Sequence, residues 1–357
     1  MPILFDEGLE EYNFGRDHPF TGERFTNFPR MLERYFEGEN YRLVKAEPVD
    51  EREVRKIAGD EYIEFTSQFF NSSNLERDSS DFSKYHSQDN MPGRRSGKME
   101  TAARLILGQA KKACDIVVKD QAKAISIGGG FHHAKPDSGE GFCLYNDVAF
   151  AAKYLLENHE ADRVMILDTD AHFGNGTYEY FSDSHSVLQV DIHQDPSTIY
   201  PGTGFAEQVG RDAGEGYTIN IPMPERAGDN SYEHVFKEVV VPVTLEFDPS
   251  VIIRNGGGDP YVGDPLTNLG LSLEGLTMVG ELVSRIQNDV GSGLVDLMVS
   301  GYSNDKLHAC WIALIAGLMG KEIETEELDH YSSEGRLAKS KQVVKKVKNI
   351  HKNYWSF

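Results

Sequence analysis

The chain contains the run Ile166-Leu167-Asp168-Thr169-Asp170-Ala171-His172, in which an apolar strand pattern ends in polar side chains at alternate positions. Alternate residues of a β-strand point to the same side, so Asp168, Asp170 and His172 face one way where the strand leaves its sheet. Buried together without a cation, these groups would lose their hydration and the carboxylates would repel each other. An Asp-x-His pattern alone is more often a solvated loop, but its oxygen and nitrogen donors suit Zn²⁺ or a similar divalent metal.

Short β-like runs alternate with helical patterns on both sides of this stretch. Several runs are continuously apolar, as in parallel strands that are covered on both faces. The alternation predicts an α/β fold with a mostly parallel sheet flanked by helices, in which sites form at the carboxyl ends of strands. The predicted strands are 124–127, 164–167, 187–190, 217–221, 251–253 and 297–299, and the predicted helices are 97–119, 146–158, 231–246 and 273–289.

The sequence shows no internal repeat and no clear linker, so we expect one domain over residues 1–357. Two segments look peripheral. Residues 67–97 are rich in Ser, Asn, Asp and charge, which predicts a long loop at the rim of the site. Residues 336–357 combine lysines with apolar residues at helical spacing, which predicts a basic amphipathic helix docked on an acidic body.

Composition narrows the classes of function. Lys plus Arg number 36 and Asp plus Glu number 57, giving a formal net charge of −21. This acidity argues against a nucleic-acid partner and would favour a cationic substrate. The scattered cysteines Cys114, Cys143 and Cys310 form no disulfide framework, which predicts a reducing, cytoplasmic location. The chain opens without a signal-peptide pattern and has no apolar run long enough for a bilayer, so we expect no membrane association.

A second polar cluster, Gly128-Gly129-Gly130-Phe131-His132-His133-Ala134, follows the predicted strand 124–127. Adjacent residues of an extended chain face opposite ways, so both histidines cannot bind one ion without a turn. A pair of acid/base or electrostatic groups is the more economical interpretation, although an isolated His-His pair is usually a chance surface or core feature.

Two further clusters follow later strands. Asp259, in Asn255-Gly256-Gly257-Gly258-Asp259-Pro260, either completes a metal site with Asp170 and His172 or belongs to an ordinary Asp-Pro turn. Tyr302, in Ser300-Gly301-Tyr302-Ser303, either directs its hydroxyl toward a substrate at that metal or packs as a ring.

Taken together and in this order, the clusters resemble the zinc-dependent histone deacetylase superfamily, which includes acetoin-utilisation and acetylpolyamine deacetylases. The likeness runs from His18-Pro19 to about Leu318. It implies an arginase-like α/β fold with one central, mainly parallel sheet. The matching motifs are His132-His133-Ala134, Gly141-Phe142-Cys143-Leu144-Tyr145-Asn146-Asp147, Asp168 to Thr177, His193-Gln194-Asp195-Pro196, Tyr200-Pro201-Gly202-Thr203-Gly204, Gly258-Asp259-Pro260 and Gly301-Tyr302.

The resemblance also implies roles for the chemical groups. Asp170, His172 and Asp259 would hold a catalytic Zn²⁺, or Fe²⁺, with positions left open for water and the acyl oxygen. His133 would be the general base and then the acid, with His132 as its electrostatic partner oriented by Asp168. Asn175 would orient His133; because it is not a carboxylate, a lower His133 pKa is expected than in relatives with Asp. Tyr302 would donate a hydrogen bond to the oxyanion.

The remaining implied roles concern the substrate and a second ion. Phe142 and Tyr200 would be aromatic walls around the methylene stem of the substrate, next to Gly141, and Asp89 a rim carboxylate that grips its backbone. The residues implied for an acetate channel are Arg24 and Phe131. Those implied for a structural K⁺ or Na⁺ are Asp168, Asp170, His172 and Asp191, with Asp191 in place of the usual Ser.

The resemblance therefore predicts a metal-dependent amidohydrolase that removes acetyl groups from lysine side chains of proteins or peptides, or from similar primary acylamines. An acetylpolyamine amidohydrolase acting on small acetylated amines is the alternative at the level of substrate. A non-catalytic acyl-lysine binding protein on a degenerate fold is the alternative at the level of class.

Overall fold

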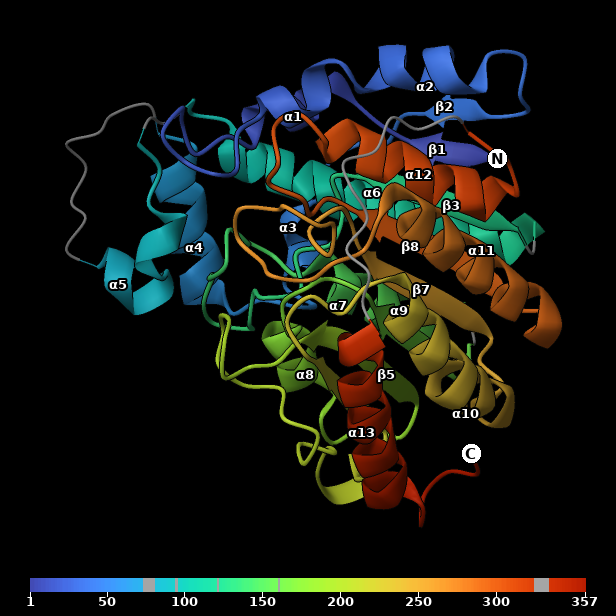
Figure 1. The fold of residues 1–357 in the computed structure, drawn as a ribbon. Coiled ribbons are helices and arrows are strands. Elements are labelled where there is room, and N and C mark those ends of the chain that lie inside the picture. Colours follow the sequence, from blue (N-terminus) through green and yellow to red (C-terminus); the bar gives the residue numbers. More distant parts are fainter. Residues whose placement is uncertain (73–80, 94–95, 121, 160, 324–333) are drawn as a thin grey trace.

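Eight parallel strands form a single sheet in this computed structural model, which describes residues 1–357 except 73–80, 94–95, 121, 160 and 324–333 (Figure 1). Every strand pair is parallel, which confirms the predicted α/β class. Across the sheet the order is β2 (Arg42–Val44), β1 (Pro2–Leu4), β3 (Lys123–Ile127), β8 (Gly293–Met298), β7 (Val251–Gly256), β4 (Val164–Asp168), β5 (Val187–Gln194) and β6 (Thr218–Met223).

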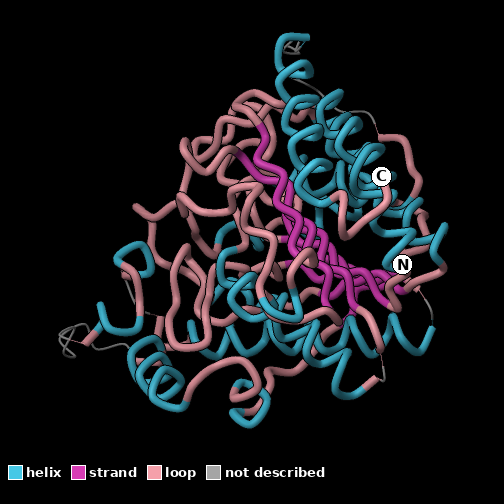
Figure 2. The backbone as a smooth tube through the Cα atoms, turned by 90° about the horizontal axis from the view of Figure 1, so that it is seen from below, coloured by secondary structure: helices cyan, strands magenta, loops and turns pink. Residues whose placement is uncertain are grey.

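Helices cover both faces of this sheet, and Figure 2 shows the strands as one twisted band between them. The α-helices are α1 (Glu23–Thr26), α2 (Phe28–Phe36), α3 (Glu51–Val54), α4 (Asp60–Phe70), α5 (Phe82–Tyr85), α6 (Met99–Asp120), α7 (Asp147–Asn158), α8 (Asn175–Phe181), α9 (Asp229–Val235), α10 (Val241–Phe247), α11 (Leu273–Val290), α12 (Leu307–Met319) and α13 (Glu334–His351). The shorter segments are η1 (Glu7–Glu11), η2 (Gln88–Asn90), η3 (Asp212–Gly214) and the π-helical η4 (Phe236–Val240).

Strand β4 shows why the central runs are continuously apolar. Val164 and Ile166 belong to the core that α6 and α7 cover, whereas Met165 and Leu167 belong to the core that α9, α11 and α12 cover. Because both faces are buried, successive side chains must all be apolar until the strand ends at Asp168. The polar residues that follow therefore emerge at the carboxyl edge of the sheet.

The structure differs from the predicted elements where local pattern is weak. Strands β1 and β2 are absent from the prediction, because three-residue strands give too little alternation to recognise. Strand β8 begins at Gly293 instead of residue 297, since its Asp296 interrupts the apolar run while making a buried ion pair with Arg254 at 2.6 Å. The predicted helix 231–246 is divided into α9, η4 and α10.

The predicted long rim loop over residues 67–97 is only partly a loop in the described part of that segment. It contains the end of α4, all of α5 and η2, while residues 73–80 and 94–95 lie outside the described residues. The ring of Phe82 packs against Phe69 with centroids 4.9 Å apart, and His86 is buried beside it. The aromatic residues supply a small core that the polar composition of the segment conceals. Its far end is anchored where Asn90 Nδ2 donates to the Cys143 carbonyl at 3.0 Å.

The C-terminal helix ends earlier than predicted. α13 spans Glu334–His351 instead of 336–357, and it packs against α9 and β6. Lys348 forms an ion pair with Glu238 at 3.0 Å and Lys346 with Glu207 at 2.7 Å, so its lysines meet the acidic body as expected. Among the described helices, none is both long and apolar enough to span a bilayer.

Candidate active site

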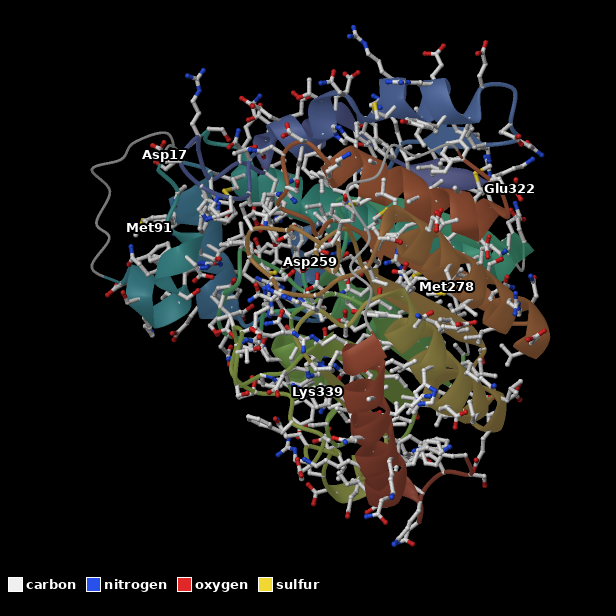
Figure 3. The ribbon with its side chains drawn as sticks, viewed as in Figure 1. Asp17, Met91, Asp259, Met278, Glu322 and Lys339 are labelled. Carbon is white, nitrogen blue, oxygen red and sulfur yellow. The ribbon has the colours of Figure 1, made fainter. Side chains whose placement is uncertain are left out.

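Three potential metal ligands converge beyond the carboxyl ends of β4 and the neighbouring β7. His172 Nδ1 lies 3.0 Å from Asp170 Oδ1 and 3.0 Å from Asp259 Oδ2, and one donor atom from each residue lies within 4.8 Å of the other two. Ser300 donates to the other Asp259 oxygen at 2.8 Å, which fixes that carboxylate. Figure 3 shows Asp259 near the middle of the molecule, whereas Glu322 lies at its edge.

The electrostatics of this triad suit a divalent cation. Burial, followed by the charge of Asp170, raises the pKa of Asp259 to about 7. Burial opposes protonation of His172, but hydrogen bonds and charge from both carboxylates raise the pKa of His172 to about 10. A proton on Nδ1 thus balances two buried carboxylates at the point where all three donors meet. A metal ion at that point would replace the proton and satisfy the same donors.

Metal affinity is therefore expected to fall as the pH falls. Because the pKa of His172 is about 10 in the metal-free protein, the ring is protonated below that pH and must release a proton when metal binds. The apparent association constant should decrease about tenfold per pH unit, and more steeply below pH 7 as Asp259 also takes up a proton. Zn²⁺ titrations against a competing chelator at several pH values from about 6 to 8 measure this slope. An affinity independent of pH would contradict the assignment of His172 as a ligand.

The two adjacent histidines lie beside the triad, with different hydrogen-bond partners. His132 Nδ1 donates to Asp168 Oδ2 at 2.7 Å, and its Nε2 lies 3.2 Å from His133 Nε2. Asp168 also accepts from Asn255 Nδ2 at 2.9 Å. Burial lowers the pKa of His132, but the nearby charges of Asp168 and Asp170 outweigh it and raise the pKa to about 9. His132 is thus positioned to stay protonated.

His133 has the opposite character. Burial, and then the charges of His132 and His172, hold the pKa of His133 well below its usual value. His133 Nδ1 donates to Asn175 Oδ1 at 2.7 Å, at the first residue of α8. The hydrogen bond with Asn175 acts the other way and raises the pKa of His133, and a lower pKa than in relatives with Asp at this position stays a prediction. His133 is thus a neutral imidazole beside the protonated His132, and it can accept a proton at Nε2 and give it back.

The backbone that carries both histidines is held by Asp147, whose role the sequence reasoning missed. The Asp147 carboxylate accepts from the backbone N–H of Gly130 at 2.9 Å and of Phe131 at 2.7 Å. Asp147 is the first residue of α7, after the N-cap Asn146. An acidic residue in a first helical turn is so common that no pattern distinguishes this contact.

The aromatic and rim residues border the same cluster. The Phe142 ring lies 5.8 Å from that of Tyr302, and the Tyr200 ring lies 5.0 Å from that of His133 (centroid distances). Asp89 accepts from the Gly141 N–H at 2.7 Å, so its carboxylate already braces the loop that carries Phe142. A Cβ at position 141 would come within 2.2 Å of the His133 ring, which explains the glycine.

Tyr302 and Arg24 lie together, and Phe131 packs against Phe20, the ring over which the Arg24 guanidinium lies. Arg24 donates to the Val299 carbonyl at 2.9 Å, and its guanidinium lies 5.4 Å from the centre of the Tyr302 ring. Both border a cavity of about 2060 Å³. Phe131 is not among the described residues that line it; its ring is stacked on Tyr12 at 4.7 Å. Burial and, less strongly, the charges of Asp170 and Asp259 raise the pKa of Tyr302 well above normal, so it remains a hydrogen-bond donor.

The residues expected to hold a monovalent ion lie along the ends of β4 and β5. Asp191 is in register with Asp168, and burial followed by the charge of Asp168 raises the pKa of Asp191. Asp191 accepts from His193 Nδ1 at 2.6 Å and from the Gly174 N–H at 3.0 Å. Because these donors already satisfy Asp191 in part, the ion stays a prediction.

Comparisons with known proteins give matches over most of the chain. The family described as "Histone deacetylase domain" matches residues 18–318. A probable deacetylase of Archaeoglobus fulgidus is 32% identical over 99% of this chain and 98% of its own length. The acetoin utilization protein AcuC of Staphylococcus aureus is 29% identical, covering 93% and 87% of the respective chains. The crystal structure of the HDA15 HD domain superposes with a TM-score of 0.82 at 25% identity, covering 99% of this chain and 97% of that one.

Proposed function

Since the chain belongs to the histone deacetylase domain family, we propose that it is a zinc-dependent amidohydrolase that removes acetyl groups from lysine side chains or similar primary acylamines. The observation that carries this proposal is the buried convergence of Asp170, His172 and Asp259 directly beside the His132–His133 pair. A mixed nitrogen and oxygen donor set with three protein ligands is typical of catalytic zinc sites.

The chain supplies the proton transfers. A bound Zn²⁺ would polarise the acetyl carbonyl and acidify a water. His133 takes the proton of the attacking water at Nε2 and then gives it to the nitrogen of the leaving amine. His132, charged and held by Asp168, stabilises negative charge that develops nearby. The Tyr302 hydroxyl donates a hydrogen bond to the acyl oxygen as it becomes an oxyanion.

Replacing Tyr302 with phenylalanine is expected to lower kcat by about 10²- to 10³-fold, because one donor to the oxyanion is lost. The ring, its contact with Phe142 and the bound metal should remain. Steady-state kinetics, with metal content measured on the same preparation, test this. A Tyr302→Phe variant that keeps the wild-type kcat would exclude the role of its hydroxyl.

The channel residues support a linear substrate. The aromatic rings of Phe142 and Tyr200 can cover a methylene chain, and the net charge of −21 suits a cationic amine as well as a lysine-rich peptide. We propose acetyl-lysine as the substrate, with acetylated polyamines as the second candidate, which the acidity favours equally. All the groups that the reaction needs are present, so a non-catalytic binding protein is the weaker proposal.

A parallel turnover measurement separates these proposals. Zinc-loaded protein is given an acetyl-lysine peptide in one arm and acetylated putrescine or spermidine in the other, each with and without a hydroxamate inhibitor. Hydroxamate-sensitive cleavage of the peptide supports the lysine deacetylase. Preference for the polyamine supports the second candidate, and no turnover of either despite bound metal would overturn both.

We propose a cytoplasmic location. Cys114, Cys143 and Cys310 are all free and buried in the structure, as expected of a protein that folds in a reducing compartment.

A further inference from the structure

We propose that Glu140 is a positioning residue that sets the tautomer of His133 by orienting the side-chain amide of Asn175. The inference rests on the proposed function, in which His133 is the base. Glu140 does not directly follow a strand, and it is not among the residues for which the family resemblance implies a role. Neither criterion therefore identifies it.

The contacts place Glu140 directly behind Asn175. Asn175 Nδ2 donates to Glu140 Oε1, while Asn175 Oδ1 faces His133 Nδ1 at 2.7 Å. Lys135 forms an ion pair with the same Glu140 oxygen at 3.1 Å. The Glu140 side chain is only 20% exposed, so these partners hold it in place.

The chain around Glu140 is fixed against the catalytic ring. The Gly139 N–H donates to the Tyr85 carbonyl at 2.8 Å, and the Gly141 N–H donates to Asp89 at 2.7 Å. Residue 141 has no room for a side chain, because a Cβ there would meet His133 at 2.2 Å. The loop therefore passes along the His133 ring and leaves Glu140 little freedom to move away.

The chemistry of the groups makes the arrangement directional. An asparagine amide presents an acceptor at one end and a donor at the other, and by itself Asn175 has no preference between them. A carboxylate only accepts, so Glu140 requires the Nδ2 end and leaves Oδ1 for His133. An oxygen at that place requires a proton on His133 Nδ1, which leaves the lone pair on Nε2. Nε2 faces His132 at 3.2 Å and is the atom that must take the proton of the water.

Glutamine at position 140 keeps the shape but loses this direction. Its own amide can turn either way, so Asn175 can also turn and present Nδ2 to His133, which favours the inactive tautomer. We expect Glu140→Gln to lower kcat by about 10- to 100-fold, as is typical when the partner of a catalytic histidine is disturbed, with little change in KM.

A double variant distinguishes positioning from a merely structural role. Asn175→Asp alone places two carboxylates together and should lower kcat. In Glu140→Gln/Asn175→Asp, the carboxylate at position 175 can only accept hydrogen bonds. It accepts one from His133 Nδ1–H and one from the amide introduced at position 140. We expect kcat of the double variant to exceed that of either single variant by about tenfold. A double variant whose loss of kcat equals or exceeds the combined losses of the two single variants would overturn the proposal.

The tautomer itself gives a readout that needs no turnover. In zinc-loaded protein labelled with ¹⁵N-histidine, the His133 signals, assigned by their loss in His133→Ala, should show the proton on Nδ1. Glu140→Gln should move a measurable fraction of the population to the Nε2–H form.

Glu53→Gln is the matched control, since Glu53 is also paired with a lysine and its side chain is 21% exposed. It should change neither kcat nor the His133 signals. If the wild type cleaves no acetylated amine, the proposed function fails, while the tautomer comparison still tests Glu140. If Glu140→Gln keeps the Nδ1–H form and the wild-type kcat, the role of Glu140 is wrong whatever the substrate.

Discussion

An Asp259→Ala variant is expected to lose tight metal binding and to lower kcat/KM by about 10⁴-fold, which corresponds to roughly 5.4 kcal/mol of transition-state stabilisation. The physical reason is that Asp259 supplies one of the donors that surround His172 Nδ1, at 3.0 Å. Without it, Asp170 and His172 remain as a simple ion pair with no excess negative charge to attract a cation. The variant should still fold, because removing one of two adjacent carboxylates relieves repulsion.

Elemental analysis of the dialysed protein, together with turnover, measures this effect. Asp264→Asn is a suitable control for metal content. Asp264 is buried in the same region, but it accepts from the backbone N–H groups of Tyr302 and Leu266 and is not one of the three residues whose donor atoms converge. The control should retain one equivalent of metal. An Asp259→Ala protein that retains one equivalent of bound metal and wild-type turnover would refute the proposed ligand set.

A His133→Ala variant is expected to lower kcat by about 10³-fold while metal content stays unchanged. His133 contacts Asn175 and His132 instead of joining the triad, so its loss removes proton transfer but no ligand. The substrate should still bind, because Phe142 and Tyr200 remain, and KM should change little.

Kinetics and metal analysis on the same preparation separate the possible outcomes. Near-normal turnover would mean that another group is the base. Loss of metal along with activity would mean that His133 supports the metal site, and its assignment as the base would then fail.

The fold could be predicted well where long-range structure leaves a local trace. The continuous apolar runs of β4 and β7 are required by burial on both faces, so they are visible in the sequence. The short strand β1 leaves no such trace, since its place in the sheet depends on pairing with distant β2 and β3. The α4–α5 region resembles a loop in the sequence because its buried aromatic residues are separated by polar ones.

The candidate site was predictable to the extent that it follows strand ends. Asp170, His172 and Asp259 follow β4 and β7, so a parallel sheet places all three at one edge. The pattern alone left Asp259 open between a metal ligand and a turn, and the family resemblance implied the full set. The structure shows that β4 and β7 are neighbours and that the three residues converge. Glu140 and Asp147 could not be found in this way. Their contacts depend on how the loop after β3 turns back on itself, and no periodicity records that path.

In the proposed function, this chain hydrolyses an acetylated amine only when a metal occupies the triad. The most direct measurement is acetate release from an acetyl-lysine peptide by zinc-loaded protein, before chelation, after chelation and after Zn²⁺ is restored. We expect the acetate released to equal the free lysine formed. Acetate release should stop on chelation and return when one equivalent of Zn²⁺ per chain is restored. Acetate release that continues unchanged in the metal-free protein would contradict the account.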